Sequence, residues 1–466
     1  MKKRKAYFVG IAGKTMGSLA KAFKDLGWEV SGSDHKGVYP PISTYLRENN
    51  LPYIEGYDAK NVPDDADLVV VGRSATMVEA ANPEVARVKK LGLLVMSFPE
   101  VFQQYLVKEN SIVVAGSYGK TTTTAILAWI LTCARKKPSF MVSDIPLNFP
   151  DGVKITDSKF SVIEGDETPA LEGNFLPKFM YYKPKYLVLT ATKWDHPEVY
   201  KSEEAYLEAF KKLVELIPST GFLVYEKRNV NSSVVKRASC RKISYSLTDR
   251  TADYFVKSYS SKEGMTKFRV RDLDLETILV GKHNLENLCG AVALSLELGL
   301  EPEIIQESVR TFKGVKSRLE LLGVYGDRFI YNDIAQFYEK VRGSLDALRD
   351  VFPDRKIICV FDPFATALKY QKSLDWYPNT FDKVDQVIIG QVNFLKKIRK
   401  EERVTGKDIV EAISQTQPNV FYEPLDEKII DFLINKTKKG EVIVFMSSGG
   451  LRFTNLIQDT IKRLTN

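Results

Sequence analysis

Short apolar runs alternate with amphipathic stretches along the first hundred residues. Apolar runs at 6–13, 28–34, 67–72 and 93–99 predict strands, and the stretch at 17–27 has the spacing of a helix. Strands that alternate with helices are typical of a parallel sheet with crossover connections. The pattern therefore predicts a Rossmann-like, doubly wound α/β domain over residues 1–108.

A second alternating series begins at the apolar run 111–116. A long helical pattern follows at 121–137, then strand patterns, a β-rich stretch at 254–281, and helical segments as far as about residue 312. A third series of strands and helices follows. We predict a central P-loop ATPase-like domain at 109–321 and a C-terminal Rossmann-like α/β domain at 322–466. The expected fold class is thus α/β with three domains.

Composition and charge narrow the functional classes. Apolar residues make up 44% of the chain and charged residues 27%, as in ordinary globular proteins, and no apolar run is long enough to span a membrane. The net charge of +8 is spread along the sequence, which does not indicate nucleic-acid binding. The four cysteines form no CxxC pair. We expect a cytoplasmic protein, a monomer or weak dimer, that acts without membrane or nucleic acid.

The strongest chemical signal is the glycine-rich segment 116–121, GSYGKT, between a strand pattern and a helix pattern. Such a turn aims backbone N–H groups and the helix dipole at a phosphate. Lys120 would reach the β- and γ-phosphates of ATP, and the Thr121 hydroxyl would bind Mg²⁺. Val114 occupies the position of the first glycine in the general GxxxxGK[ST] pattern. The context still predicts an ATP site.

A second glycine-rich turn lies at 10–17, GIAGKTMG, and Asp34 follows at the end of the next strand pattern. Alone it indicates an NAD site, a UDP site or a tight turn. A chain with both this turn and a P-loop is much less common than a chain with either.

This combination resembles the Mur ligases, which join an amino acid or peptide to a UDP-muramoyl carboxylate at the expense of ATP. The chain looks most like the muropeptide ligases, and next most like the UDP-N-acetylmuramate–L-alanine ligases. The resemblance runs nearly end to end, and YPPIST and MSSGG are its more specific segments. The similar segments lie at residues 32–44, 55–59, 163–167, 178–189, 314–323 and 446–450.

The resemblance implies the substrates and the residues that bind them. UDP-N-acetylmuramate and an acceptor, either a peptide such as L-Ala-γ-D-Glu-diaminopimelate or an amino acid, are the implied partners, with ATP and Mg²⁺. The implied catalytic residues are Lys120, Glu164, His196 and Arg318, and the implied Mg²⁺ ligands are Thr121, Glu164 and His196. The implied ATP-binding residues are Gly116, Ser117, Tyr118, Gly119, Lys120, Thr121, Thr122, His283, Asn284, Asn287, Arg318 and Asp333. The implied UDP-sugar contacts are Gly10, Gly13, Gly17, Asp34, Gly72 and Ser74.

Several positions depart from the family pattern. Lys193 lies just before the Asp195–His196 pair and could weaken Mg²⁺ binding by charge repulsion. Gln336 and Phe337 stand where a His-His pair is usual, and Phe364 replaces an arginine. Loss of that arginine removes planar, bidentate recognition of a carboxylate. The acceptor is therefore different, or the acceptor chemistry is weakened.

Three alternatives stay open at this point. The chain could be a UDP-N-acetylmuramate–L-alanine ligase, although YPPIST and MSSGG speak against it. It could be a nucleotide-binding relative with lost or altered ligation that serves as a regulatory or scaffold protein, as the changes at Gln336, Phe337 and Phe364 suggest. An NAD-dependent oxidoreductase is disfavoured, because such an enzyme has no use for a P-loop.

Overall fold

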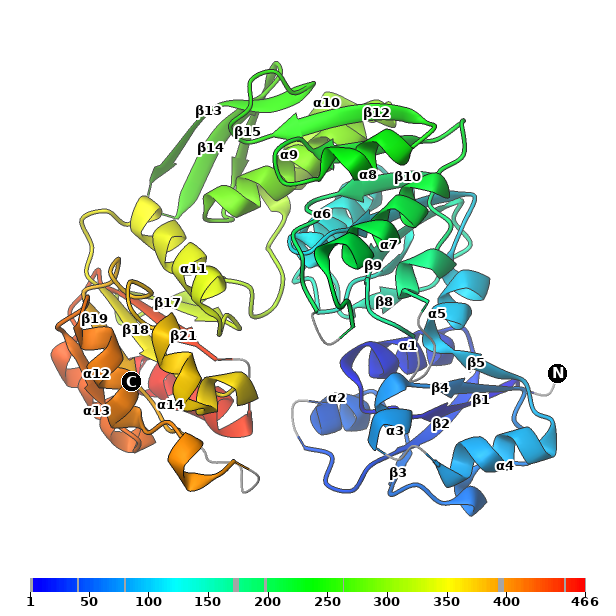
Figure 1. The fold of residues 1–466 in the computed structure, drawn as a ribbon, viewed down its shortest axis with the longest axis horizontal. Coiled ribbons are helices and arrows are strands. Elements are labelled where there is room, and N and C mark those ends of the chain that lie inside the picture. Colours follow the sequence, from blue (N-terminus) through cyan, green and yellow to red (C-terminus); the bar gives the residue numbers. More distant parts are fainter. Residues whose placement is uncertain are drawn as a thin grey trace. The chain divides into compact units, whose positions relative to one another are not determined.

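The computed structural model describes residues 3–39, 42–78, 81–170, 176–196, 199–262, 264–392, 398–447 and 450–465. It contains three sheets flanked by helices (Figure 1). The chain divides into two compact units. The first comprises residues 1–259, 267–277 and 284–315, and the second comprises 260–266, 278–283 and 316–466.

The first sheet has the order β3-β2-β1-β4-β5, and its four strand pairings are all parallel. Its centre, β1, is buried at Ala6, Tyr7, Phe8 and Val9, as expected for a strand covered by helices on both faces. The alternating pattern of the sequence is therefore that of a doubly wound domain. Its elements are β1 (Lys5–Val9), α1 (Lys14–Asp25), β2 (Glu29–Asp34), α2 (Ile42–Glu48), β3 (Tyr53–Glu55), β4 (Leu68–Val71), α3 (Arg73–Val78), α4 (Pro83–Leu91), β5 (Val95–Ser97) and α5 (Phe98–Val101).

The second sheet has ten strands in the order β15-β14-β13-β12-β11-β10-β6-β9-β7-β8. The strand β6 lies between β9 and β10 and is parallel to both, so the carboxyl ends of these three strands meet at one edge. Its elements are β6 (Asn110–Ala115), α6 (Lys120–Cys133), β7 (Ser139–Met141), β8 (Val153–Lys154), β9 (Phe160–Gly165), β10 (Tyr186–Leu189), α7 (Glu203–Glu215), β11 (Phe222–Glu226), α8 (Ser232–Arg237), β12 (Arg241–Ser246), β13 (Tyr254–Lys262), β14 (Met265–Val270), β15 (Leu273–Thr277), α9 (Lys282–Glu297) and α10 (Pro302–Thr311).

The third sheet has the order β16-β17-β21-β18-β19-β20. Only β16 is antiparallel among its described pairings, and it begins at Glu320, two residues before the predicted domain start. Its elements are β16 (Glu320–Tyr325), β17 (Arg328–Asp333), α11 (Tyr338–Val351), β18 (Ile357–Phe361), β19 (Gln386–Ile389), α12 (Gly406–Ser414), β20 (Val420–Tyr422), α13 (Asp426–Lys436), β21 (Val442–Met446) and α14 (Leu451–Thr465).

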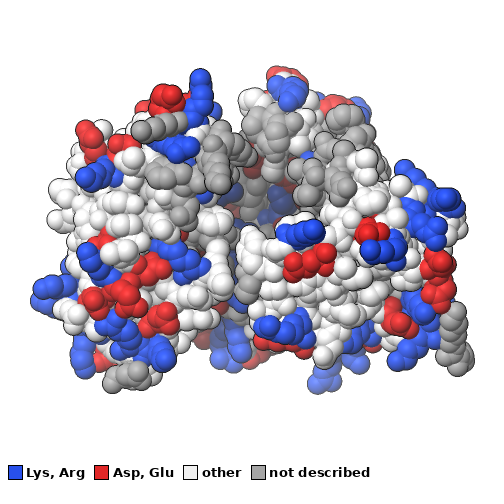
Figure 2. All heavy atoms as spheres, turned by 90° about the horizontal axis from the view of Figure 1, so that it is seen from below, with Lys and Arg blue, Asp and Glu red and all other residues white. Residues whose placement is uncertain are grey.

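Charged side chains of both signs are mixed on the surface. Lys and Arg side chains are intermixed with Asp and Glu side chains on the face drawn in Figure 2. No helix of the described chain is both long and apolar enough to cross a membrane.

Candidate functional site

The turn between β6 and α6 has the backbone shape that its glycines predict. Gly116 has φ of +142° and Gly119 has φ of +80°, which L side chains rarely adopt. A Cβ on Gly116 would lie 2.2 Å from Thr190 Oγ1, and one on Gly119 would lie 2.5 Å from Asn287 Oδ1. The Ser117 N–H donates to the Ala191 carbonyl at 3.1 Å. The turn is thus packed closely against the segment after β10 and against α9.

The close approach at Gly119 gives a first prediction. We expect Gly119→Ala to lower the free energy of unfolding by about 1–3 kcal/mol and to weaken nucleotide binding, because the new methyl group adds a steric clash to backbone strain. Gly299→Ala is the matched control: its φ is +74°, but nothing lies within 4 Å of the added Cβ. Urea unfolding and nucleotide titration of both variants measure the difference. Equal effects in the two variants would contradict the packing argument.

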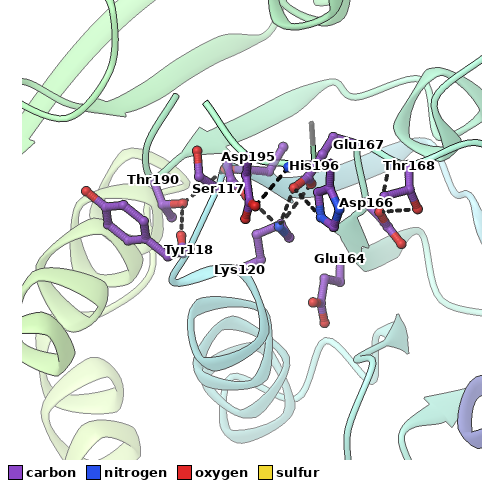
Figure 3. Close-up of polar contacts among 12 residues, drawn as sticks. Ser117, Tyr118, Lys120, Glu164, Asp166, Glu167, Thr168, Thr190, Asp195 and His196 are labelled. Carbon is purple, nitrogen blue, oxygen red and sulfur yellow. Dashed lines mark hydrogen bonds and ion pairs between the residues drawn. The ribbon is translucent and has the colours of Figure 1, made fainter. Parts of the chain in front are cut away.

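Lys120, the first residue of α6, points its ammonium group at an acidic partner (Figure 3). Its Nζ lies 2.9 Å from Glu167 Oε2 and 2.5 Å from the Gly116 carbonyl oxygen. The Glu167 side chain is 1% exposed. Burial by itself lowers the pKa of Lys120, but the Glu167 carboxylate outweighs it, so the pKa is raised and the lysine stays charged. Glu167 ends the segment 163–167 that resembles the family, but nothing in the sequence identifies it as a site residue.

A second carboxylate, Glu164, binds the hydroxyl groups beside the turn. Thr121 Oγ1 donates to Glu164 Oε1 at 2.8 Å, and Ser143 donates its N–H at 2.8 Å and its hydroxyl at 2.9 Å. Burial raises the pKa of Glu164, against the effect of these hydrogen bonds and of Lys120. Two of the expected metal ligands, Thr121 and Glu164, are therefore in direct contact.

The third expected metal ligand, His196, lies in another group. Ligand atoms of Glu167, Asp195 and His196 all lie within 4.8 Å of one another, and His196 Nε2 is 3.7 Å from Glu167 Oε1. His196 has φ of +58°, an uncommon backbone conformation for a residue other than glycine. Two carboxylates and an imidazole at this spacing could hold a divalent cation. The neighbouring Asp166 is already bound by Lys178 at 2.6 Å.

The expected adenine segment begins α9. Asn284 and Asn287 are buried, whereas His283 is exposed. Asn287 Nδ2 lies 3.4 Å from Asn284 Oδ1, and the other end of the Asn287 amide faces Gly119. This start of α9 therefore lies against the glycine-rich turn. Thr122 is half-buried in the first turn of α6.

The same region contains a carboxyl pair that sequence reasoning missed. Glu226, at the end of β11, is completely buried and accepts a hydrogen bond from the Arg228 N–H at 2.7 Å, while its Oε1 has no donor. Asn229 Nδ2 donates to Glu286 Oε2 at 3.1 Å. Burial, together with the Glu226 carboxylate, raises the pKa of Glu286 to about 7. Glu286 therefore holds its proton to a higher pH than an ordinary glutamate.

This pair predicts a pH dependence of stability. The pKa of Glu286 is raised in the folded state from an ordinary 4.5 to about 7, so the folded state binds the proton more tightly. Glu286 therefore makes its full contribution to the free energy of unfolding below pH 4.5, and this contribution is lost as the pH rises through about 7. We expect Glu286→Gln to reduce this loss by about 1–2 kcal/mol. Urea unfolding at pH 5 and pH 8 tests it, with the exposed Glu303→Gln as control; parallel pH dependences in wild type and Glu286→Gln would contradict it.

The expected UDP-sugar contacts lie at the carboxyl ends of β1, β2 and β4. The N–H of Gly10 donates to the Ser33 carbonyl at 2.9 Å, and the buried Asp34 carboxylate accepts from the Ala12 N–H at 2.6 Å. Asp34 thus fixes the glycine-rich turn itself. The N–H of Gly72 donates to the Val9 carbonyl at 2.9 Å. Gly13 precedes α1 and Gly17 lies within it, whereas the side chain of Ser74 is outside the described part.

Arg318 and Asp333 belong to the second unit. Asp333 ends β17, is buried, and accepts hydrogen bonds from the Ser344 hydroxyl and, at 3.1 Å, from the Ala335 N–H. Burial raises the pKa of Asp333. Arg318 is exposed between Ser317 (φ +55°) and Leu319 (φ +47°), so two left-handed residues flank it.

The departures from the family pattern have structural consequences. The Lys193 carbonyl accepts a hydrogen bond from the Ser117 hydroxyl at 2.5 Å, so the segment before Asp195 fixes the glycine-rich turn. Gln336 is buried, whereas Phe337 and Phe364 are each 39% exposed. The acceptor face predicted from sequence therefore presents aromatic rings.

The fold and the site define a multidomain α/β protein with a P-loop, acidic groups beside it, and a second glycine-rich turn. Three family models match the chain in succession: "Mur ligase family, catalytic domain" at residues 5–109, "Mur ligase middle domain" at 114–295 and "Mur ligase, glutamate ligase domain" at 317–449. The chain belongs to the Mur ligase family, whose enzymes form carbon–nitrogen bonds at the expense of ATP.

Individual relatives match over nearly the full length. The chain is 28% identical to the UDP-N-acetylmuramate–L-alanyl-γ-D-glutamyl-meso-2,6-diaminoheptandioate ligase of Escherichia coli, over 95% of each chain. It is also 28% identical to the UDP-N-acetylmuramate–L-alanine ligase of Desulfitobacterium hafniense, over 96% of this chain and 97% of the relative. The fold is similar to the crystal structure of UDP-N-acetylmuramate–alanine ligase from Thermotoga maritima, with a TM-score of 0.78, 21% identity and 98% coverage of both chains.

Proposed function

We propose that this chain joins the amine of a peptide to the lactyl carboxylate of UDP-N-acetylmuramate, with ATP converted to ADP and phosphate. The observation that carries the proposal is the turn at 116–121, whose lysine is held by a carboxylate at the carboxyl edge of a parallel sheet. Ligand sites in open α/β sheets lie at this edge. The full-length similarity to the diaminoheptandioate ligase of Escherichia coli supports the choice of substrates.

The proposed reaction has two steps. The lactyl carboxylate attacks the γ-phosphate of ATP, breaks its bond to the bridging oxygen and forms an acyl phosphate with release of ADP. The acceptor amine then attacks the acyl carbon, loses a proton and releases phosphate. Lys120 stabilises charge on the transferred phosphoryl group, and backbone N–H groups of the glycine-rich turn bind the phosphates. Arg318 is proposed as a second cation for the same group. On binding, the nucleotide replaces Glu167 as the partner of Lys120.

The chain offers two groups that fit Mg²⁺. One consists of Thr121 and Glu164, the other of Glu167, Asp195 and His196. Carboxylate and hydroxyl oxygens are the hard ligands that Mg²⁺ prefers, so the donor set fits, with the histidine as its less usual member. When bound, Mg²⁺ would neutralise phosphate charge. We propose Thr121, Glu164 and His196 as Mg²⁺ ligands, as the family resemblance implies. Glu167, which holds Lys120 and lies beside His196, is proposed as a further ligand.

Two other functions have support from specific observations. Equal identity to an L-alanine ligase makes L-alanine the second candidate acceptor. The aromatic rings of Phe337 and Phe364 on the acceptor face favour, as a third candidate, a nucleotide-binding relative that has lost or altered ligation.

One assay separates these functions. The protein is incubated with ATP, Mg²⁺ and UDP-N-acetylmuramate, and phosphate release is measured with L-Ala-γ-D-Glu-diaminopimelate or with L-alanine. We expect release that depends on the tripeptide. Release that depends on L-alanine would assign the second function, and ATP binding without turnover on any acceptor would assign the third. Absence of any affinity for ATP with Mg²⁺ would overturn the ligase proposal.

A further inference from the structure

The loop that follows β18 in the second unit, residues 362–365, is held in place by Gln336. The Gln336 amide nitrogen donates to the Asp362 carbonyl at 3.1 Å and to the Ala335 carbonyl at 3.2 Å. Its Oε1 accepts from the N–H groups of Phe364 at 2.8 Å and Ala365 at 3.1 Å. Every hydrogen-bonding position of this amide is occupied within the protein. Gln336 therefore shapes the loop and has no capacity left for a substrate.

The arginine at the same edge of the sheet is also occupied. Arg452, in the first turn of α14, places Nη1 at 2.9 Å from Asp362 Oδ2 and Nη2 at 2.6 Å from Asp426 Oδ1. Asp362 is 3% exposed, so the pair is largely desolvated. A guanidinium held between two carboxylates has its charge and its geometry already matched. Arg452 is consequently not available to bind a substrate carboxylate in place of the family arginine that Phe364 replaces.

One cation at this edge lacks such a partner. Lys369 ends the 3-10 helix η4 (Thr366–Lys369) and is only 5% exposed. Within the described chain its Nζ makes no hydrogen bond or ion pair; it lies over the ring of Phe364, 5.4 Å from the centroid. Burial lowers its pKa, and the charge on Asp362 opposes that effect only in part. A buried ammonium that no carboxylate of the protein contacts is costly, which points to an anion that the free protein does not supply.

Apolar surface lies next to this lysine. Phe364, whose ring covers it, is 39% exposed, and Phe337 follows Gln336 directly along the chain. The ring of Phe337 packs edge to face on Trp376, with centroids 6.0 Å apart, and both rings are exposed to a similar degree. Large aromatic side chains left open in this way are typical of binding surfaces.

We propose that Lys369 Nζ binds a carboxylate of the acceptor as a single charge, and that Phe364 packs against the adjoining hydrocarbon of the acceptor. The inference rests on the proposed ligase function and names the group that recognises the acceptor. A lysine imposes no bidentate geometry, so it accepts a carboxylate from a wider range of directions than an arginine. The ligand class is an amine that carries a free carboxylate next to an apolar carbon chain.

The test uses Lys369→Met, which removes the charge and keeps most of the side-chain volume, and Lys369→Gln as a second variant. Lys372→Met is the matched control, because Lys372 also lies over an aromatic ring, that of Tyr370 at 5.8 Å, but is exposed. We expect the KM for the acceptor to rise at least about tenfold in both Lys369 variants and to stay unchanged in Lys372→Met. A lysine that only supported the loop would instead lower the Tm and leave the KM unaltered.

Acceptors in which each carboxylate is replaced in turn by a carboxamide identify the group that is bound. One of these carboxamides should raise the KM for the acceptor about tenfold in the wild type and should raise it no further in Lys369→Met. If every carboxamide raises the KM by the same factor in the wild type and in Lys369→Met, the inference is wrong.

Hydroxylamine separates this inference from the proposed function. It needs no carboxylate site, and its attack on an acyl phosphate gives a hydroxamate and phosphate. We expect the ratio of acceptor ligation to hydroxamate formation to fall at least about tenfold in Lys369→Met. Hydroxamate formation with an unchanged ratio would overturn only the role of Lys369. No hydroxamate in the wild type would overturn the acyl-phosphate reaction, and the inference with it.

Discussion

Lys120→Ala is expected to lower ATP-dependent phosphate release by about 10³-fold, more than any other single substitution in this chain proposed above. The ammonium group is the only one in the described part of the chain that contacts both the Gly116 carbonyl and Glu167. Under the proposed mechanism, its loss removes the cation that stabilises the developing charge on the phosphoryl group. It also leaves a carboxylate that is 1% exposed without its ion-pair partner.

The binding of UDP-N-acetylmuramate should be largely intact in this variant, because its expected contacts lie on the first sheet. Calorimetric titration with the UDP-sugar and a phosphate-release assay measure the two properties separately. Lys212→Ala, an exposed lysine on α7, is the control and should change neither. Loss of both UDP-sugar binding and turnover in Lys120→Ala would show that the two glycine-rich turns have been assigned to the wrong ligands.

Glu167→Gln is expected to lower turnover by about 10²-fold and to raise the Mg²⁺ concentration needed for half-maximal activity. The substitution keeps the shape of the side chain but removes the charge that holds Lys120 and that lies with Asp195 and His196. The raised pKa of Lys120 should fall, because the Glu167 carboxylate is what raises it.

The comparison of Glu167→Gln with Glu164→Gln tells which carboxylate has more influence on the metal. Initial rates over a range of Mg²⁺ concentrations give the answer, with Glu208→Gln on the exposed side of α7 as the control. An unchanged Mg²⁺ dependence in Glu167→Gln, with a changed one in Glu164→Gln, would restrict the metal to the group proposed from sequence.

The arrangement of strands and helices could be predicted from sequence for a simple physical reason. In parallel sheets the central strands are buried on both faces, so runs such as 112–115 and 357–361 are apolar throughout and easy to detect. Glycine-rich turns after such strands were equally visible. The family comparisons confirm the membership predicted from these motifs.

The contacts within the site were less accessible to sequence reasoning. Glu164 and Glu167 are three residues apart, and only the path of the chain after β9 decides that Glu167 reaches Lys120. The pairing of Glu226 with Glu286 joins residues far apart in sequence. Gln336 reads as a lost histidine, yet its four hydrogen bonds give it a different role, which no local pattern reveals.

The two left-handed residues beside Arg318 limit how this enzyme can be engineered. Glycine at Ser317 would relieve backbone strain of about 1 kcal/mol. At Leu319 the same gain would be outweighed, because that leucine is 8% exposed and its removal from the core costs about 2–5 kcal/mol. Glycine beside Arg318 would also give the backbone there more conformational freedom, so the arginine would be held less firmly in one orientation. Under the proposed role of Arg318, a design that introduces glycine at Ser317 would therefore exchange reaction rate for heat resistance.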